Sequence, residues 1–221
     1  PEELVDRAAE LGYAALAITD ENSLAGVVRA HTAAKSHPRL KILIGAEITP
    51  DDAPPIALWA QNRQGYGQLC GLITRGRRRA EKGSCRLTLD DIAAHSDNLS
   101  AGIVPPGDCG DAPPDALWDY REMFGRRLSL LAELHRGPRD ERRLAQLQEW
   151  SRQTRIPLAA AGGVLFHSPG RKALQDVVTA IRHGTTVAGA GELLLPNAER
   201  HLKTLAEIRA EVSCAFGNDQ W

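Results

Sequence analysis

The stretch LGYAALAITDENSLAG, residues 11–26, predicts a strand, an acidic turn and the start of a helix. Residues 14–19 are an apolar run of strand length that ends in two β-branched residues. Asp20 and Glu21 follow at its carboxyl end, and a helix is expected over residues 24–36. Folds with parallel strands build their sites at the carboxyl ends of those strands, so this turn is the first candidate site.

A second strand is predicted over Lys41–Ile48, and it carries one acid, Glu47, near its end. Neighbouring parallel strands would bring Asp20, Glu21 and Glu47 to one edge of the sheet, where their carboxylates could share a cation or a polar network. The alternative is that Asp20 and Ser23 cap the following helix and that Glu47 is a rim acid. The spacing of these residues leaves both interpretations open.

Strand-like and helix-like segments alternate along the rest of the chain. Strands are expected at residues 14–19, 41–48, 56–60, 101–104, 127–134 and 156–161. Most are separated by amphipathic helices and short loops, which indicates an α/β fold with a parallel sheet. The number of strands favours a barrel-like closure over a doubly wound sheet.

Three helices have features that the structure can test. In residues 139–153 the apolar stripe is formed by Leu144, Leu147 and Trp150. In residues 169–183 the residues expected to face the core are Leu174, Val177, Val178 and Ile181. A last helix is expected from Asn197 to about residue 212.

Composition excludes several classes of protein. The chain has 221 residues and a net charge of −1, which gives no overall attraction to nucleic acid or to an anionic membrane. No segment offers the roughly 18 uninterrupted apolar residues of a membrane-spanning helix. The four cysteines form no CxxC pair, which argues against a zinc knuckle and a disulfide scaffold and favours a reducing cytoplasm.

One segment is strongly basic. The cations between residues 75 and 86 are Arg75, Arg77, Arg78, Arg79, Lys82 and Arg86, with a single acid among them. This segment is expected at the end of a helix, where cations favour the helix dipole, so a plain solvated end is one interpretation. The other is a contact with the DNA backbone or a neighbouring domain. The segment has no aromatic residue, so nothing in it indicates base stacking.

Five stretches, in this order, resemble the N-terminal PHP domain of bacterial C-family DNA polymerases, the relatives of the polymerase III α subunit. They are LGYAALAITDENSLAG, IGAEI, AQNRQGYGQLCGLITRGRRRAEKG, PLAAAGGVLFHSPGRKALQDVVTAIRHGT and LPNAERHL. The pieces RRRAEKG and PNAERHL are most similar to the error-prone branch of that family. The resemblance covers residues 1–208 as one barrel domain, and residues 209–221 read as a divergent tail.

The resemblance implies a distorted (β/α)₇ barrel that lacks its first strand in this chain, since the family's opening His-x-His motif would lie before Pro1. Without that strand the sheet cannot close. We therefore expect open edges at residues 14–19 and 156–161, together with marginal stability and self-association of the isolated chain.

In catalytic relatives of the resembled family, histidines and acids at strand ends hold up to three metal ions that cleave phosphoester bonds. The Thr-Asp-His motif appears here as TDE at residues 19–21, Gly-x-Glu as GAE at 45–47, and the late Asp-x-His as GVL at 163–165. The resemblance thus implies a degenerate site without catalytic residues. It would hold at most one weakly bound Mg²⁺, Mn²⁺ or Zn²⁺ on a remnant set of Asp20, Glu21 and Glu47.

The function implied by the resemblance is that of a structural domain in an error-prone DNA polymerase, which synthesises DNA in replication, repair and damage tolerance. The expected partners are the polymerase domains of the parent chain and, through that parent, DNA and the sliding clamp, all in the cytoplasm. Two alternatives remain: a metal-dependent phosphoesterase or 3′–5′ exonuclease, and a stand-alone non-catalytic binding protein.

Overall fold

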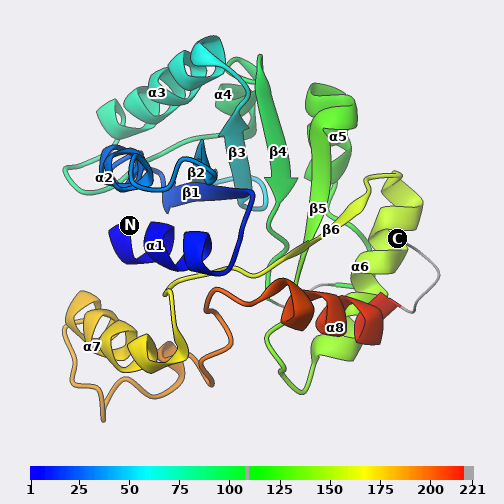
Figure 1. Cartoon of the computed structure of the whole chain (residues 1–221). Coiled ribbons are helices and arrows are strands. Elements are labelled where there is room, and N and C mark those ends of the chain that lie inside the picture. Colours follow the sequence, from blue (N-terminus) through cyan, green and yellow to red (C-terminus); the bar gives the residue numbers. More distant parts are fainter. Residues whose placement is uncertain (108–109, 217–221) are drawn as a thin grey trace.

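The computed structural model describes residues 1–107 and 110–216, with side chains as far as residue 211 (Figure 1). Its strands are β1 (Ala15–Glu21), β2 (Lys41–Ile48), β3 (Ile56–Ala60), β4 (Leu99–Ile103), β5 (Leu128–Glu133) and β6 (Leu158–Ala161). Its helices are α1 (Glu2–Glu10), α2 (Val27–Ala34), α3 (Arg63–Arg78), α4 (Leu89–Ala93), α5 (Ala116–Phe124), α6 (Asp140–Thr154), α7 (Lys172–Arg182) and α8 (Leu205–Phe216). The α/β class predicted from the sequence is confirmed.

The six strands form one curled sheet in chain order, and one strand is reversed. β1 pairs parallel with β2, and β4, β5 and β6 are parallel neighbours, whereas β3 is antiparallel to both β2 and β4. The expectation of a wholly parallel sheet is therefore wrong at β3. Only residues 49–55 join β2 to β3, too few for the helical crossover that parallel neighbours require. The other five strands still place their carboxyl ends at one rim of the sheet, the carboxyl rim.

The sheet is a half-barrel with two free edges. β1 and β6 are the outermost strands, as expected for a sheet that lacks a closing strand. Within the described residues no strand pairs with their outer sides. The gap between them is crossed by irregular backbone, which forms an isolated parallel bridge between Phe166 and His201.

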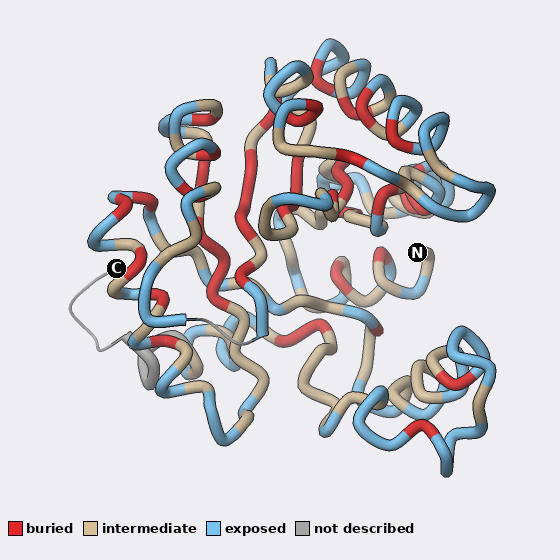
Figure 2. Tube along the Cα trace, turned by 180° about the vertical axis from the view of Figure 1, so that it is seen from behind, coloured by how far each residue is buried: buried red, intermediate tan, exposed pale blue. Residues whose placement is uncertain are grey.

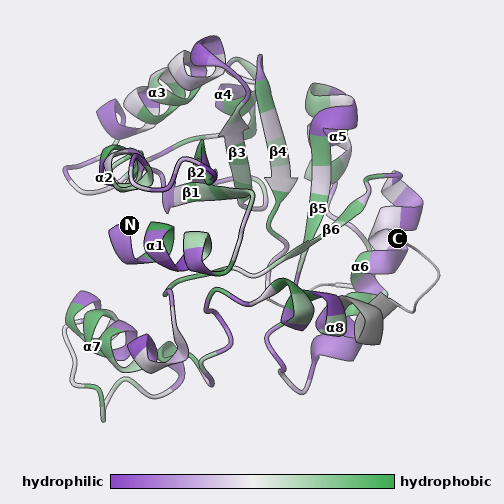
Figure 3. Cartoon of the chain, viewed as in Figure 1, coloured by the Kyte–Doolittle hydropathy of each residue, from purple (hydrophilic) through white to green (hydrophobic). Residues whose placement is uncertain are grey.

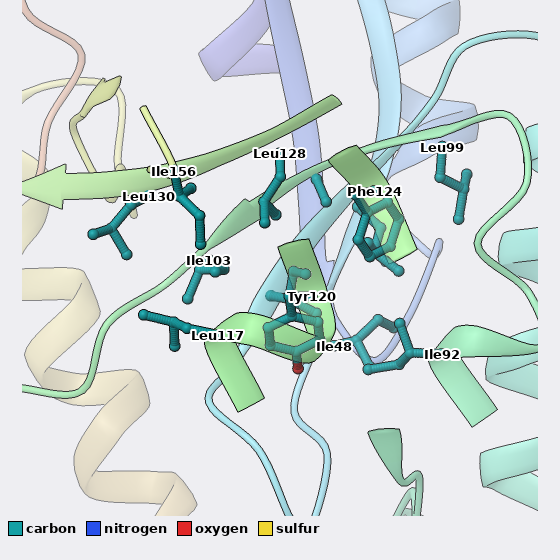
Figure 4. Packing of buried hydrophobic residues seen from close by; sticks show 14 of the residues in the cluster. Ile48, Ile92, Leu99, Ile103, Leu117, Tyr120, Phe124, Leu128, Leu130 and Ile156 are labelled. Atoms are coloured by element: carbon teal, nitrogen blue, oxygen red, sulfur yellow. The ribbon is translucent and has the colours of Figure 1, made fainter. Parts of the chain in front are cut away.

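The main hydrophobic core lies on the outer face of β2 to β5, under α3, α4, α5 and α6 (Figures 2 and 4). Trp150 and Leu147 of α6 and Tyr120 of α5 are almost fully buried there, and Leu144 is buried beside them. The Tyr120 hydroxyl donates a hydrogen bond of 2.9 Å to the carbonyl oxygen of Pro54, which satisfies its buried polar end. The stripe predicted for α6 is thus confirmed.

A smaller core joins β1 to α1 and α2. Val5, Ala8, Ile18 and Val27 are buried in it. Leu202, from the far end of the chain, is buried in the same cluster. The segment before α8 therefore fastens the free β1 edge of the half-barrel.

The expectation for the helix at residues 169–183 is wrong in one respect, because its apolar face is not covered. The exposed fractions are 53% for Leu174, 44% for Val177, 47% for Val178 and 72% for Ile181. Figure 1 shows α7 to one side of the molecule, away from the sheet, and Figure 3 shows hydrophobic residues along it. Periodicity identified an apolar face correctly, but it carries no information on what covers that face.

The last helix begins later than expected. Residues 197–204 are irregular, and α8 starts at Leu205. Its start is set by Thr204, whose hydroxyl accepts a hydrogen bond from the Glu207 amide, while the Glu207 carboxylate accepts one from the Thr204 amide. This reciprocal cap places the start of the helix eight residues after the predicted start at Asn197. The expected boundary between residues 208 and 209 falls inside α8.

Candidate functional site

A cavity of about 420 Å³ lies at the inner face of the half-barrel and opens between its two free edges. Its walls come from β1, β5, β6 and the segment 200–203, and its charged or polar lining residues include Glu47, Glu133, Arg200, Lys203 and Glu211. The Trp59 indole lies across the inner face of the sheet. A Cβ atom at Gly45 or Gly102 would come within 2.7 Å of that ring.

Glu21 and Glu47 lie side by side near the ends of the first two strands. They are register partners in the parallel pair of β1 and β2, and Glu47 lines the cavity. Burial raises the pKa of Glu47, and the carboxylates of Glu133 and Glu21 raise it further, whereas the Arg200 guanidinium lowers it. Glu21 and Glu47, two of the three residues predicted for the remnant site, therefore lie together. Glu133, which was not predicted from the sequence, lies near them.

Asp20 has a different role from its neighbour. β1 runs two residues further than predicted, so Asp20 is in the strand, opposite Ala46. Its carboxylate accepts a hydrogen bond of 2.6 Å from the Gly26 amide, which precedes the first residue of α2. Side chains alternate between the two faces of a strand, so this contact separates Asp20 from Glu21. This contact at the start of α2 agrees with the alternative interpretation, in which Asp20 caps the following helix.

At the late motif the ligand position is filled by other groups. Gly163 lies just past β6 with φ of +50°, and a Cβ atom there would approach Glu133 Oε2 to 2.6 Å and Arg200 Nη2 to 2.9 Å. Arg200 Nε donates a hydrogen bond of 2.5 Å to the Gly163 carbonyl oxygen, and Arg200 Nη2 lies 4.0 Å from Glu133 Oε2. The space of an aspartate side chain is thus occupied by an arginine and a glutamate.

These residues do not fit a metal cluster. A two-metal hydrolytic site needs ligands that hold two cations about 3.5–4 Å apart. Among the side chains that the structure describes, those of residues 1–107 and 110–211, no three His, Cys, Asp or Glu side chains lie close enough to hold one ion. Leu165, at the second position of the late motif, has no atom that could bind a metal.

A second ionic group closes the cavity at α8. Lys203 has only 6% of its side chain exposed, and its Nζ lies 2.6 Å from Glu211 Oε1 and 3.1 Å from Glu199 Oε2. Arg136 lies 3.4 Å from both of those carboxylates. Each buried charge in this group has a partner, which is the condition for a stable buried charge.

Glu133, Arg200 and Lys203 were not predicted as site residues. A signal for Glu133 was present, because LSLLAE ends in an acid after an apolar strand, as KILIGAEI nearly does with Glu47. Arg200 and Lys203 lie in the irregular segment 197–204, and no local pattern indicates which strands that segment reaches.

Much of the basic segment holds the fold together. Arg75 Nε lies 2.8 Å from Asp91 Oδ1, and Arg79 Nη1 lies 2.6 Å from Asp91 Oδ2. The Asp91 side chain is 4% exposed and also forms the capping box of α4 with Thr88. Arg77 donates to the carbonyl oxygens of Gly83, Ser84 and Asn22.

Two cations of the segment are not used in this way. Arg78 and Lys82 are exposed, and among the described residues neither side chain has a hydrogen-bond or ion-pair partner. The sequence alone could not separate them from Arg75, Arg77 and Arg79, because Asp91 and the Asn22 carbonyl oxygen, which bind those three, lie outside the segment.

None of the described helices has the length and apolarity needed to cross a membrane.

The family model for the PHP domain matches residues 1–133 of this chain. Among curated proteins, the error-prone DNA polymerase of Pseudomonas paraeruginosa is 49% identical over 208 residues, or 94% of this chain and 20% of the relative. That of Rhodopirellula baltica is 40% identical over 218 residues, or 94% of this chain and 19% of the relative.

The chain thus spans about a fifth of the length of the curated relatives it matches. Among solved structures, a protein from Bifidobacterium adolescentis, provisionally assigned as a metal-dependent phosphoesterase, superposes with a TM-score of 0.51 at 16% identity. The superposition covers 97% of this chain and 90% of that one. At this identity the likeness concerns the fold, a curled half-barrel with surrounding helices.

Proposed function

Because the chain belongs to the PHP domain family, we propose that it is a structural, non-hydrolytic PHP domain of an error-prone DNA polymerase. One observation carries the non-hydrolytic part: the late ligand position is Gly163, and Glu133 and Arg200 fill the space where a ligand would project. The polymerase context is supported by 48% identity over 94% of the chain to the error-prone DNA polymerase of Pseudomonas aeruginosa.

The metal-dependent phosphoesterase or exonuclease is the less favoured function. It would need several ligands at the carboxyl rim, and the described residues there offer Glu21, Glu47 and Glu133 with an arginine among them. We propose at most one weakly held Mg²⁺, Mn²⁺ or Zn²⁺ at this rim, without a catalytic role.

We predict that the purified chain hydrolyses neither p-nitrophenyl phosphate nor the 3′ ends of DNA, with Mg²⁺, Mn²⁺ or Zn²⁺ added. The reason is that one weakly held cation cannot bridge the attacking and leaving oxygens. Initial rates should equal those of the buffer with metal alone. A metal-dependent rate that disappears in Glu47→Ala but persists in Asp90→Ala, an exposed acid on α4, would overturn the proposal.

The partners that we propose are the polymerase domains of the parent chain and, through it, DNA and the sliding clamp in the cytoplasm. The exposed apolar face of α7 supports a contact with further polypeptide, because a contiguous apolar helix face in water is unfavourable. The unpaired edges of β1 and β6 are two further surfaces that additional chain could cover.

The basic segment of Arg75, Arg77, Arg78, Arg79 and Lys82 is proposed as a contact with DNA or a neighbouring domain. Its available part is Arg78 and Lys82, since the other three bind elsewhere in this chain. In a chimaera that carries this chain in place of the matching region of the Pseudomonas aeruginosa polymerase, Arg78→Glu with Lys82→Glu should weaken DNA binding for all sequences.

The salt dependence of that binding separates the two kinds of contact. Two lost phosphate contacts should lower the slope of log affinity against log salt concentration by about 2. Arg152→Glu, on the exposed side of α6, is the matched control. An unchanged slope together with a lower melting temperature of the chimaera would assign the two cations to an interface between domains.

A further inference from the structure

The carboxyl rim concentrates negative charge around one arginine. Glu47, Glu133 and Glu21 are close enough for each of the latter two to raise the pKa of the first. The Arg200 side chain is 29% exposed and that of Glu133 is 15% exposed, so water screens this group only in part. Carboxylates held together away from water are stabilised by a cation, either a bound ion or a basic side chain.

Arg200 is held in place from both its backbone and its side chain. Its carbonyl oxygen accepts hydrogen bonds from the amides of Leu165 and Phe166, at 2.9 and 3.3 Å. Its Nε donates to the Gly163 carbonyl oxygen, which leaves the guanidinium beside the Glu133 carboxylate. The arginine is therefore fixed between the end of β5 and the segment that follows β6.

The missing side chain at Gly163 makes this arrangement possible. A Cβ atom there would meet the Glu133 carboxylate and the Arg200 guanidinium at less than 3 Å, so in this arrangement both groups lie in the space that a side chain would occupy. Glycine also accepts the φ of +50° at this position. Gly163, Glu133 and Arg200 thus form one cluster in which each residue lies against the other two.

We propose that Arg200 is a tethered cation that performs at this rim the charge-balancing role of a bound metal ion. A guanidinium remains protonated at every physiological pH and cannot be removed by a chelator or diluted away. Its charge and its hydrogen bond also join the segment after β6 to the carboxyl rim. A metal ion with ligands from both would join them in the same way. This inference concerns the folded 221-residue chain and does not depend on the polymerase context.

The test is the melting temperature of the chain with and without divalent cations. The wild-type value should be unchanged by millimolar Mg²⁺, Ca²⁺ or EDTA. In Arg200→Met we expect a fall of roughly 5–10 °C, because the carboxylates lose their counter-charge. Millimolar Mg²⁺ or Ca²⁺ should recover part of that loss, since hard cations bind carboxylate oxygens. Arg200→Lys, which keeps the charge but not the Nε donor, should lose less.

Two further variants make the result specific to this charge cluster. Glu133→Gln combined with Arg200→Met should regain part of the melting temperature and lose the response to divalent ions. Should Arg200→Met fail to fold, recovery of folding in this double variant supports the proposal, and continued failure overturns it. Arg152→Met, which breaks an exposed pair with Glu149 of 2.6 Å, should change nothing. A wild-type melting temperature that falls in EDTA, or an Arg200→Met value equal to wild type, overturns the proposal.

Discussion

Replacement of Asp91 by alanine is expected to lower the melting temperature of the chain by roughly 5–10 °C, through the loss of about 2–4 kcal/mol. The Asp91 carboxylate is 4% exposed and binds Arg75, Arg79 and the Thr88 amide. The variant would lose both ion pairs that join α3 to α4, together with the capping box of α4. Thermal unfolding followed by circular dichroism measures the effect.

Asp90→Ala is the control for that experiment, since Asp90 is the preceding residue of α4 but is exposed. It should change the melting temperature by no more than about 1 °C. Asp91→Asn keeps the shape of the side chain and should fall between the two. A small effect of Asp91→Ala would mean that Arg75 and Arg79 are free to act elsewhere, which would restore the full basic segment as a candidate for DNA contact.

Replacement of Gly163 by aspartate is expected to lower the melting temperature by roughly 5 °C or more, without creating a metal site. The change restores the residue expected at the late motif, but its Cβ atom would lie 2.6 Å from Glu133 Oε2. It also adds a negative charge beside Glu133 and Glu47 and forces a side chain onto a backbone with φ of +50°. Melting curves with and without millimolar Mn²⁺ measure both expectations.

Gly184→Asp separates the cost of a side chain at positive φ from the cost of crowding against Glu133 and Arg200. Gly184 has φ of +62°, and a Cβ atom there meets nothing within 4 Å. Its variant should therefore lose only the roughly 1 kcal/mol typical of a side chain in this conformation. A Gly163→Asp chain that Mn²⁺ stabilises above wild type would show that the rim can still assemble a metal site.

The sequence predicted best what depends on neighbouring residues. The bounds of β2 and β3 match the prediction residue for residue, because turn residues flank both apolar runs. The Thr88 cap of α4 is a local feature of the same kind, since a cap and the amide that it binds lie within one turn.

Features that depend on how separate segments are placed relative to one another were not predicted. The direction of β3 is decided by the length of the loop before it, and the face to which Asp20 points is decided by where β1 ends. Glu133 and Arg200 meet only because two distant segments reach the same rim. The periodicity of α7 identifies its apolar face but does not indicate whether another part of the protein packs against that face.

The fastening of the half-barrel by residues 200–203 has a consequence for the order of folding. The Tyr13 hydroxyl donates to the Lys203 carbonyl oxygen across 190 residues of chain, and Leu202 fills the core of α1 and α2. Contacts between such distant residues incur a large loop-closure entropy and form slowly, whereas the strands pair with their sequence neighbours. During synthesis, β1 to β6 emerge before residue 200, so the sheet can form before residues 200–203 complete the wall of the cavity. The charged rim is therefore a late product of folding, completed when the segment of Arg200 reaches the free edge of β1.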